Sequence, residues 1–139
     1  MSDAEIRDKK LERLKRDVDP VRTAEQASAQ TTTDSYALVD ESKIQPAGRE
    51  HLSYIVEETG GSNGVDARIV KRNKNAAGNW GGWVPDDGSD AEETNISADG
   101  VQDLKPSDTE ADEYGVEIKA NTGGSQGDVK VTGVARAGH

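Results

Sequence analysis

The sequence predicts a mainly β protein, an antiparallel, jelly-roll-like β-sandwich preceded by a short N-terminal α-helix. First, runs rich in β-branched and aromatic residues alternate with clusters of turn residues. Second, apolar and polar residues alternate with a period of two toward the C-terminus. Third, helical spacing of apolar residues is confined to the start of the chain. These patterns predict a helical anchor over residues 1–22, a linker over 23–33 and a β-sandwich over 34–139.

The predicted helix spans residues 3–18, with Ser2 or Asp3 as its N-cap, and Pro20 ends it. Apolar residues of the predicted anchor, 1–22, form one narrow seam in a heptad pattern, which we call the seam residues: Leu11, Leu14, Val18 and Val21. A seam this narrow cannot fold alone, so we expect the helix to serve oligomerisation or docking. The alternative is a helix that lies on its own domain or is partly frayed.

The predicted linker, residues 23–33, is rich in Ala, Gln, Ser and Thr, a composition typical of connecting segments. Four short runs beyond it have the composition of strands, and turn clusters at 45–48 and 60–64 separate some of them. The four predicted strands are 36–39, 51–57, 65–72 and 79–84. Spacing of this kind indicates a sandwich or a barrel.

The clearest strand signal is a predicted hairpin near the C-terminus, with loop 122–127 between its two strands. The apolar residues that alternate are Tyr114, Val116, Ile118 and Ala120 on the first strand, and Val129, Val131 and Gly133 on the second. This alternation predicts that one face lies on the core, while the other is solvated or paired with a partner.

The middle of the chain is strongly acidic. Residues 85–117 contain twelve acids and one base, Lys105, in a chain of net charge −10. Such a field repels phosphate backbones, so we expect no nucleic-acid partner. Two interpretations stay open, a surface adapted to high salt or an ordinary solvated loop region. The low apolar content of 86–112 predicts one or two edge strands with long loops.

The composition allows only a thin core. Hydrophobic residues make up 32% of the chain and aromatic residues 4%, with no Phe, so the core must consist mainly of Val, Ile, Leu and Ala. We therefore expect a homo-oligomer, a trimer or a pentamer, or docking on a larger body. No apolar run approaches the roughly 20 residues that span a bilayer, and acids offset the bases of the helix, so we expect no membrane partner.

The residue types that catalysis needs are scarce. The chain has no Cys, and its only histidines are His51 and His139, which cannot form a pair with metal-ligand spacing. A nucleophile elbow and a phosphate-binding glycine loop are both absent from the sequence. The acidic run 86–90 lacks the spacing and final Glu of an EF-hand loop, which favours a solvated loop. We therefore predict no enzyme activity, no catalytic residue, no metal site and no cofactor.

Trp80 and Trp83 are the most distinctive side chains, because they lie three positions apart on either side of two glycines. In a regular strand their rings would face opposite sides. The first interpretation is therefore one tryptophan in the core and the other at an interface or under a loop. The alternative is an aromatic platform for a sugar or another polymer.

Several segments follow one another in a recognisable order. They are 31–39 (TTTDSYALV), 44–48, 52–56 (LSYIV), the predicted strand with Trp83, 114–120 (YGVEIKA) and 127–135 (GDVKVTGVA). In this order they resemble small virion structural proteins of tailed phages, β-sandwich domains that serve as head decorations, turrets or tail-associated pieces. The acidity is similar to that of viruses infecting haloarchaea. The resemblance covers about residues 31–135; the helix lies outside it, and the acidic stretch is a long insertion.

This resemblance implies a non-enzymatic structural protein located in the virion of a tailed virus, with capsid or tail proteins as partners. Its place would be a capsid decoration, a turret, or a head–tail or tail-associated component. The alternative is a receptor- or glycan-binding β-sandwich module on a viral tail or surface, and exposure of the tryptophans distinguishes the two. A third possibility is a cellular or secreted β-domain with no viral role.

Overall fold

The computed structural model describes residues 23–26, 30–60 and 63–137. The predicted helix and the seam residues lie outside the described residues. Within the described part, the chain forms ten strands and one short 3₁₀ helix, η1 (Asp40–Ser42). The strands are β1 (Thr23–Gln26), β2 (Gln30–Thr31), β3 (Ala37–Leu38), β4 (His51–Glu58), β5 (Val65–Arg72), β6 (Val84–Pro85), β7 (Glu92–Ile96), β8 (Val101–Leu104), β9 (Glu113–Ala120) and β10 (Asp128–Arg136).

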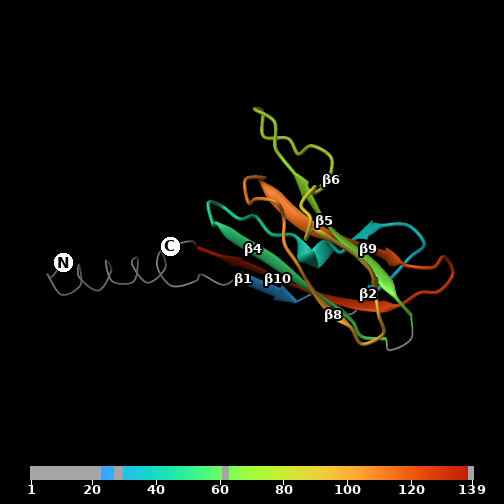
Figure 1. Cartoon of the computed structure of the whole chain (residues 1–139). Coiled ribbons are helices and arrows are strands. Elements are labelled where there is room, and N and C mark those ends of the chain that lie inside the picture. The colour runs from blue at the N-terminus through green and yellow to red at the C-terminus, as the bar shows by residue number, and fades with distance from the viewer. Residues whose placement is uncertain (1–22, 27–29, 61–62, 138–139) are drawn as a thin grey trace, which may run out of the picture.

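These strands form two antiparallel sheets that pack face to face (Figure 1). Sheet A has the order β1-β10-β4-β8, and β2 also pairs with β10. Sheet B has the order β3-β9-β5-β6, and β7 also pairs with β5. The chain changes sheet from β2 to β3, β3 to β4, β4 to β5, β7 to β8, β8 to β9 and β9 to β10. This alternation between two sheets is the jelly-roll arrangement, and the predicted fold class is confirmed.

The predicted C-terminal hairpin is wrong, although both of its strands are present. β9 lies in sheet B, where it pairs with β5 and β3, whereas β10 lies in sheet A, where it pairs with β4 and β1. The loop 121–127 therefore crosses from one sheet to the other. Alternation shows which face of a strand is buried, and both strands face one core, so the pattern holds no information about which strands pair.

The segment predicted as a linker contains two strands instead of a free connection. β1 pairs with β10 from Thr132 to Ala135, and β2 pairs with Asp128 and Val129 of the same strand. Their sequences, TAEQ and QT, carry no apolar alternation, so composition alone favours a linker. The pairing covers backbone groups at the edge of β10, and the described sandwich therefore begins at Thr23.

Two other predictions concern the middle of the chain. The acidic stretch does contain two strands, β7 on β5 and β8 on β4, as its few apolar residues predict. The predicted strand 79–84 is mostly loop, because only Val84 continues into β6 and Trp80 makes an isolated bridge with Lys74.

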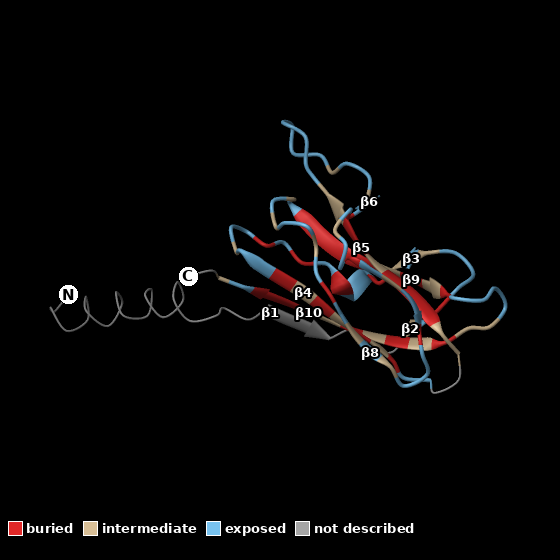
Figure 2. Ribbon diagram, viewed as in Figure 1, coloured by how far each residue is buried: buried red, intermediate tan, exposed pale blue. Residues whose placement is uncertain are grey.

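The core lies between the sheets and consists of Val, Ile, Leu and Ala side chains together with two tyrosines (Figure 2). Tyr54 and Tyr114 are fully buried and supply the volume that the missing phenylalanines would give. A buried tyrosine needs a partner for its hydroxyl. The Tyr54 hydroxyl donates to the carbonyl of Ser42 at 2.8 Å, and the Tyr114 hydroxyl donates to the carbonyl of Asp108 at 2.9 Å.

The two ends of the described sandwich lie side by side. Thr23 is opposite Ala135, and His51 is opposite Arg136, so the chain enters and leaves sheet A at the same end (Figure 1). We call this the chain-end face of the sandwich. None of the helical structure in the described residues is long and apolar enough to span a bilayer.

Candidate functional site

Two hollows lie at the chain-end face. The first, hollow 1, has a volume of about 590 Å³, and the second, hollow 2, has a volume of about 360 Å³. Hollow 1 lies over the ends of β4, β8 and β10, with loop 105–109 along one side. Hollow 2 lies between three loops, 45–48, 74–80 and 109–112. Thr109 lines both hollows, so they are neighbours.

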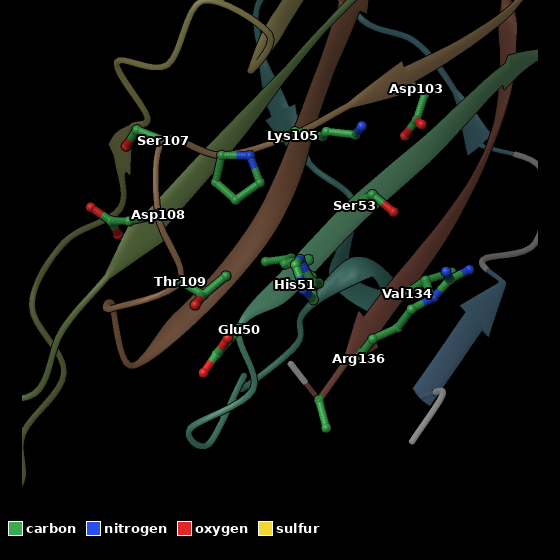
Figure 3. Close-up of a pocket in the computed structure, with 13 residues that line it drawn as sticks. Glu50, His51, Ser53, Asp103, Lys105, Ser107, Asp108, Thr109, Val134 and Arg136 are labelled. Atoms are coloured by element: carbon green, nitrogen blue, oxygen red, sulfur yellow. The ribbon is translucent and has the colours of Figure 1, made fainter. Parts of the chain in front are cut away.

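Hollow 1 brings together groups that could be mistaken for a catalytic set. Figure 3 shows His51 and Ser53 on β4, with Asp103 and Lys105 toward β8 and Arg136 on β10. An activated serine needs a base within hydrogen-bond reach of its hydroxyl. In the part of the chain that the structure describes, no hydrogen bond joins Ser53 to His51 or His51 to Asp103. Hollow 1 is therefore a polar groove with mixed charges and no nucleophile–base pair.

The buried carboxylates act as structural ties. The Asp86 side chain is fully buried, and its Oδ1 accepts hydrogen bonds from the backbone N–H groups of Gly88 and Ser107 at 2.8 and 2.9 Å. Its Oδ2 accepts from the Ser107 hydroxyl at 3.2 Å and lies 3.4 Å from Nζ of Lys71. Every buried side-chain nitrogen or oxygen among the described residues has a partner. These acids therefore hold loops to strands, as burial of a charge requires.

The run 86–90 is predicted to be a solvated loop, and the structure agrees with this prediction only in part. Asp87 and Asp90 are exposed, whereas Asp86 is buried. Across 23–26, 30–60 and 63–137, no three His, Cys, Asp or Glu side chains are arranged to hold a metal ion.

Both tryptophans contact one arginine. The guanidinium of Arg72 lies 4.2 Å from the centroid of the Trp80 ring and 4.5 Å from that of Trp83. Glu113 fixes the arginine, accepting a hydrogen bond from its Nε at 2.8 Å. Neither tryptophan is in the core; each is half-buried. The rings meet on one side because residues 79–83 form a loop with Gly81 and Gly82, where the alternation of a strand does not apply.

A second ring follows the same pattern on the same sheet. Tyr36 lies over Arg68, with the guanidinium 3.9 Å from the ring centroid, and Nζ of Lys119 is 5.1 Å from it. Glu117 accepts a hydrogen bond from Nε of Arg68 at 2.8 Å. Three of the five aromatic residues in the chain thus lie outside the core, on arginines that glutamates of β9 hold in place. Such cation–π contacts contribute about 0.5–1 kcal/mol each at exposed sites.

The sequence contains a signal for this cluster in the spacing of its charged residues. Arg68 and Arg72 lie four positions apart on the predicted strand 65–72, and Glu113 and Glu117 lie four apart near the next strong strand. An antiparallel pairing of these strands brings each arginine opposite one glutamate, and the structure has this register, Arg68 with Glu117 and Arg72 with Glu113.

A projecting finger carries one of the two tryptophans, Trp80. Residues 73–81 leave the sandwich after β5 and project from it, exposed along most of their length (Figures 1 and 2). Asn75 Oδ1 accepts from the N–H groups of Ala77 and Asn79, both at 3.0 Å, which closes the tip of the finger. At its base, Asn73 Oδ1 accepts from the N–H of Asp112 at 2.9 Å, and Asp112 Oδ2 accepts from the N–H of Lys74 at 2.8 Å. These reciprocal bonds join the finger to loop 109–112.

The predicted docking residues Leu11, Leu14, Val18 and Val21 are outside the described part of the chain, so their docking role stays a prediction. The structure does show where their segment joins the sandwich. It joins at Thr23, opposite Ala135, and hence beside Arg136 of hollow 1.

The sequence matches no family model and no curated protein. The structure is similar to several solved structures at low identity. The SPBc2 prophage-derived protein YomS is 13% identical with a TM-score of 0.48, covering 85% of this chain and 95% of that one. A Bacillus endospore appendage pilus protein is 10% identical with a TM-score of 0.40, covering 88% and 94%. VP2 from a subviral particle of infectious bursal disease virus is 11% identical with a TM-score of 0.46, covering 86% of this chain and 32% of that one. All three TM-scores are below 0.5, so these similarities carry no argument about the function of this chain.

Proposed function

We propose that this chain is a non-enzymatic structural protein of a virion, a decoration, turret or tail-associated component that displays its sandwich on a larger assembly. The observation that carries the proposal is that the charged groups of the described domain hold its structure together. The buried acids tie loops to strands, and the arginines hold aromatic rings on the outside of sheet B, where they are available for contacts. The resemblance of residues 31–135 to virion proteins of tailed phages adds the kind of assembly.

In this proposal residues 1–22 attach the protein through Leu11, Leu14, Val18 and Val21, and the sandwich is the displayed part. Because β1 starts at Thr23, directly after the anchor, the chain-end face is tied closely to the surface beneath. The opposite end, which carries the β4–β5 and β9–β10 loops, then faces outward.

Deletion of residues 1–22 tests the anchor. We expect the truncated protein to keep its β circular dichroism and cooperative unfolding but to be absent from purified particles. The double substitution Leu11→Asp with Leu14→Asp should have the same effect at full length. A control double substitution, Lys9→Gln with Arg16→Gln, changes the net charge equally but leaves the seam intact, so this variant should incorporate normally. Normal incorporation of the truncated protein would show that the sandwich itself carries the docking surface.

We further propose that the protein is a homotrimer or homopentamer, because its core is thin and three of its five aromatic side chains lie outside that core. Sedimentation equilibrium of the full-length protein should give a mass of three or five chains. A monomer at every concentration and salt tested would contradict this state and would leave the anchor experiment to judge attachment separately.

A further inference from the structure

We propose that hollow 2, at the base of the finger, binds a neutral saccharide of one or two rings. This inference goes beyond the structural role proposed above and does not depend on it. It rests on three properties of the hollow: its fixed walls, its single aromatic surface and its balance of donors and acceptors.

The walls of hollow 2 are fixed before any ligand arrives. The reciprocal bonds between Asn73, Lys74 and Asp112 lock the finger to the facing loop at 2.8–2.9 Å. The Trp80 ring is held by Arg72, which Glu113 anchors in turn, and by the ammonium group of Lys74, 4.6 Å from the ring centroid. A site whose walls are already ordered loses little conformational entropy on binding, so weak contacts suffice for measurable affinity.

The lining suits a molecule with both C–H faces and hydroxyl groups. Trp80 is its only large apolar side chain; otherwise the apolar lining is limited to small groups such as Ala47 and Ala111. An apolar ligand would therefore bury little surface against protein, whereas the C–H face of one sugar ring can pack on one indole. The volume of about 360 Å³ lies near the lower end of the roughly 300–1,000 Å³ usual for small-molecule sites.

The polar lining combines donors and acceptors. Thr109 supplies a hydroxyl group, and Glu110 and Asp112 supply carboxylate oxygens, one of which already accepts from the backbone N–H of Lys74. The ammonium group of Lys74 lies 4.6 Å from the centroid of the Trp80 ring. Among the described residues, the Glu110 carboxylate and the Thr109 hydroxyl make no hydrogen bond to protein. Adjacent sugar hydroxyls both donate and accept, so they can satisfy a carboxylate and a protein hydroxyl group at once.

The charge of the lining selects against acidic ligands. The lining holds one ammonium group and two carboxylates, Glu110 and Asp112, in a chain of net charge −10. A sialylated, uronic or sulfated sugar, a phosphate or an acidic peptide would meet net repulsion here. A neutral saccharide meets none, which leaves it as the class that fits the shape, the aromatic surface and the charge together.

The test uses the full-length protein and named sugars. Methyl glucoside, methyl galactoside, methyl mannoside, N-acetylglucosamine, lactose and cellobiose are titrated while saturation-transfer NMR records binding, and 3′-sialyllactose and glucuronic acid serve as charged probes. An array of immobilised neutral glycans extends the panel. We expect at least one neutral sugar to bind saturably and the charged probes to bind at least tenfold more weakly.

Variants then locate the site. Trp80→Ala and Glu110→Gln should each weaken binding at least fivefold, and Glu110 is exposed, so its substitution leaves the fold intact. Trp83→Phe is the matched control, because Trp83 contacts the same arginine but does not line the hollow, and binding should persist. In that variant Trp80 is the only tryptophan, and its fluorescence should shift with the same affinity.

Three results would overturn the proposal: no neutral sugar binds in solution or on the array, only charged sugars bind, or Glu110→Gln and Trp80→Ala both bind as the unmodified protein does. None of these bears on incorporation into particles, so the saccharide site and the structural role can fail separately.

Discussion

Gly133 lies on the core side of β10, directly opposite Tyr54 of β4. A Cβ at this position would clash with Cδ1 of Ile44 and would be 2.7 Å from Cε1 of Tyr54. The Tyr54 ring is fully buried and its hydroxyl is bonded to the Ser42 carbonyl, so the ring cannot move aside without losing that hydrogen bond. The glycine is therefore required for close packing, since its φ is not in the left-handed region.

We predict that Gly133→Ala lowers the free energy of unfolding by about 1–3 kcal/mol, the usual cost of forcing one methyl group into a packed core. Urea denaturation followed by circular dichroism measures the change. Gly123→Ala is the control, because a Cβ there meets nothing within 4 Å and no positive φ is required. Equal stability of the two variants would mean that Ile44 and Tyr54 repack at little cost.

The tyrosines predict how stability depends on pH at the alkaline end. Burial, the largest cause, raises the pKa of Tyr36 to about 12 and that of Tyr114 to about 12, and burial also raises the pKa of Tyr54. In the unfolded chain each tyrosine titrates near about 10. Between these values the unfolded state has lost protons that the folded state keeps, so the stability present below pH about 10 decreases as pH rises toward about 12.

Spectrophotometric titration of the phenolates checks this prediction. The folded protein should show little phenolate absorbance at about one pH unit above the unperturbed value, whereas the protein in denaturant should titrate there fully. Complete titration of the folded protein near about 10 would contradict the burial of Tyr36 and Tyr114.

At the scale of elements, the short strands β1 and β2 belong to the fold. Both pair with β10, which they cover along one edge. Deletion of residues 1–22 should therefore leave the free energy of unfolding unchanged, whereas deletion of residues 1–31 should lower it. Each backbone hydrogen bond lost contributes about 0.5–1.5 kcal/mol, and the exposed edge should promote aggregation.

Urea denaturation and light scattering of the two truncated proteins measure the difference. If both are equally stable and equally soluble, residues 23–31 are the dispensable connection that their composition suggests.

Local patterns predict where the long strands lie but not how they pair. The sequence predicts a strand over 65–72, and β5 has these bounds; the prediction of 51–57 misses one residue of β4. The predicted and observed strands agree because burial alternates from one residue to the next, which is a pattern that consecutive residues show directly. β9 and β10 pair in different sheets because pairing depends on residues far away in the chain, which no local period records.

For the candidate site, too, the sequence predicts which residues matter but not how they are arranged. The sequence singles out Trp80 and Trp83 by type and spacing, but it assigns one of them to the core. Both instead lie on Arg72, because a loop with two glycines sets their directions and Glu113 on another strand holds the arginine. Tyr36 and Arg68 repeat the arrangement, and the sequence does not predict their contact, because no motif links the two residues.

At the scale of the whole molecule, surface acidity predicts a response to salt. Three of the twelve acids in 85–117, namely Asp86, Glu113 and Glu117, form ion pairs in the structure. The others are exposed or half-exposed: Asp87, Asp90, Glu92, Glu93, Asp99, Asp103, Asp108, Glu110 and Asp112. Repulsion among them is screened over about 10 Å at 0.1 M salt and about 3 Å at 1 M.

We therefore predict that the melting temperature rises between 0.1 and 1 M sodium chloride, as measured by scanning calorimetry. The triple variant Asp87→Lys, Asp90→Lys, Asp103→Lys should show a smaller rise, because it removes like charges from the same region. A melting temperature that stays constant or decreases would mean that the fold already separates or pairs these acids.

The position of β10 controls when the molecule can fold. This strand lies in the interior of sheet A, between β1 and β4, yet it is the last of the described strands to leave the ribosome. Until residues 128–136 emerge, β1 and β2 have no partner and β4 has only β8. Sheet A therefore closes after nearly the whole described sandwich has been translated, and such long-range pairing is slow. Any chain interrupted before β10 lacks the strand on which β1, β2 and β4 pair, so the order of synthesis itself keeps unfinished copies from completing sheet A.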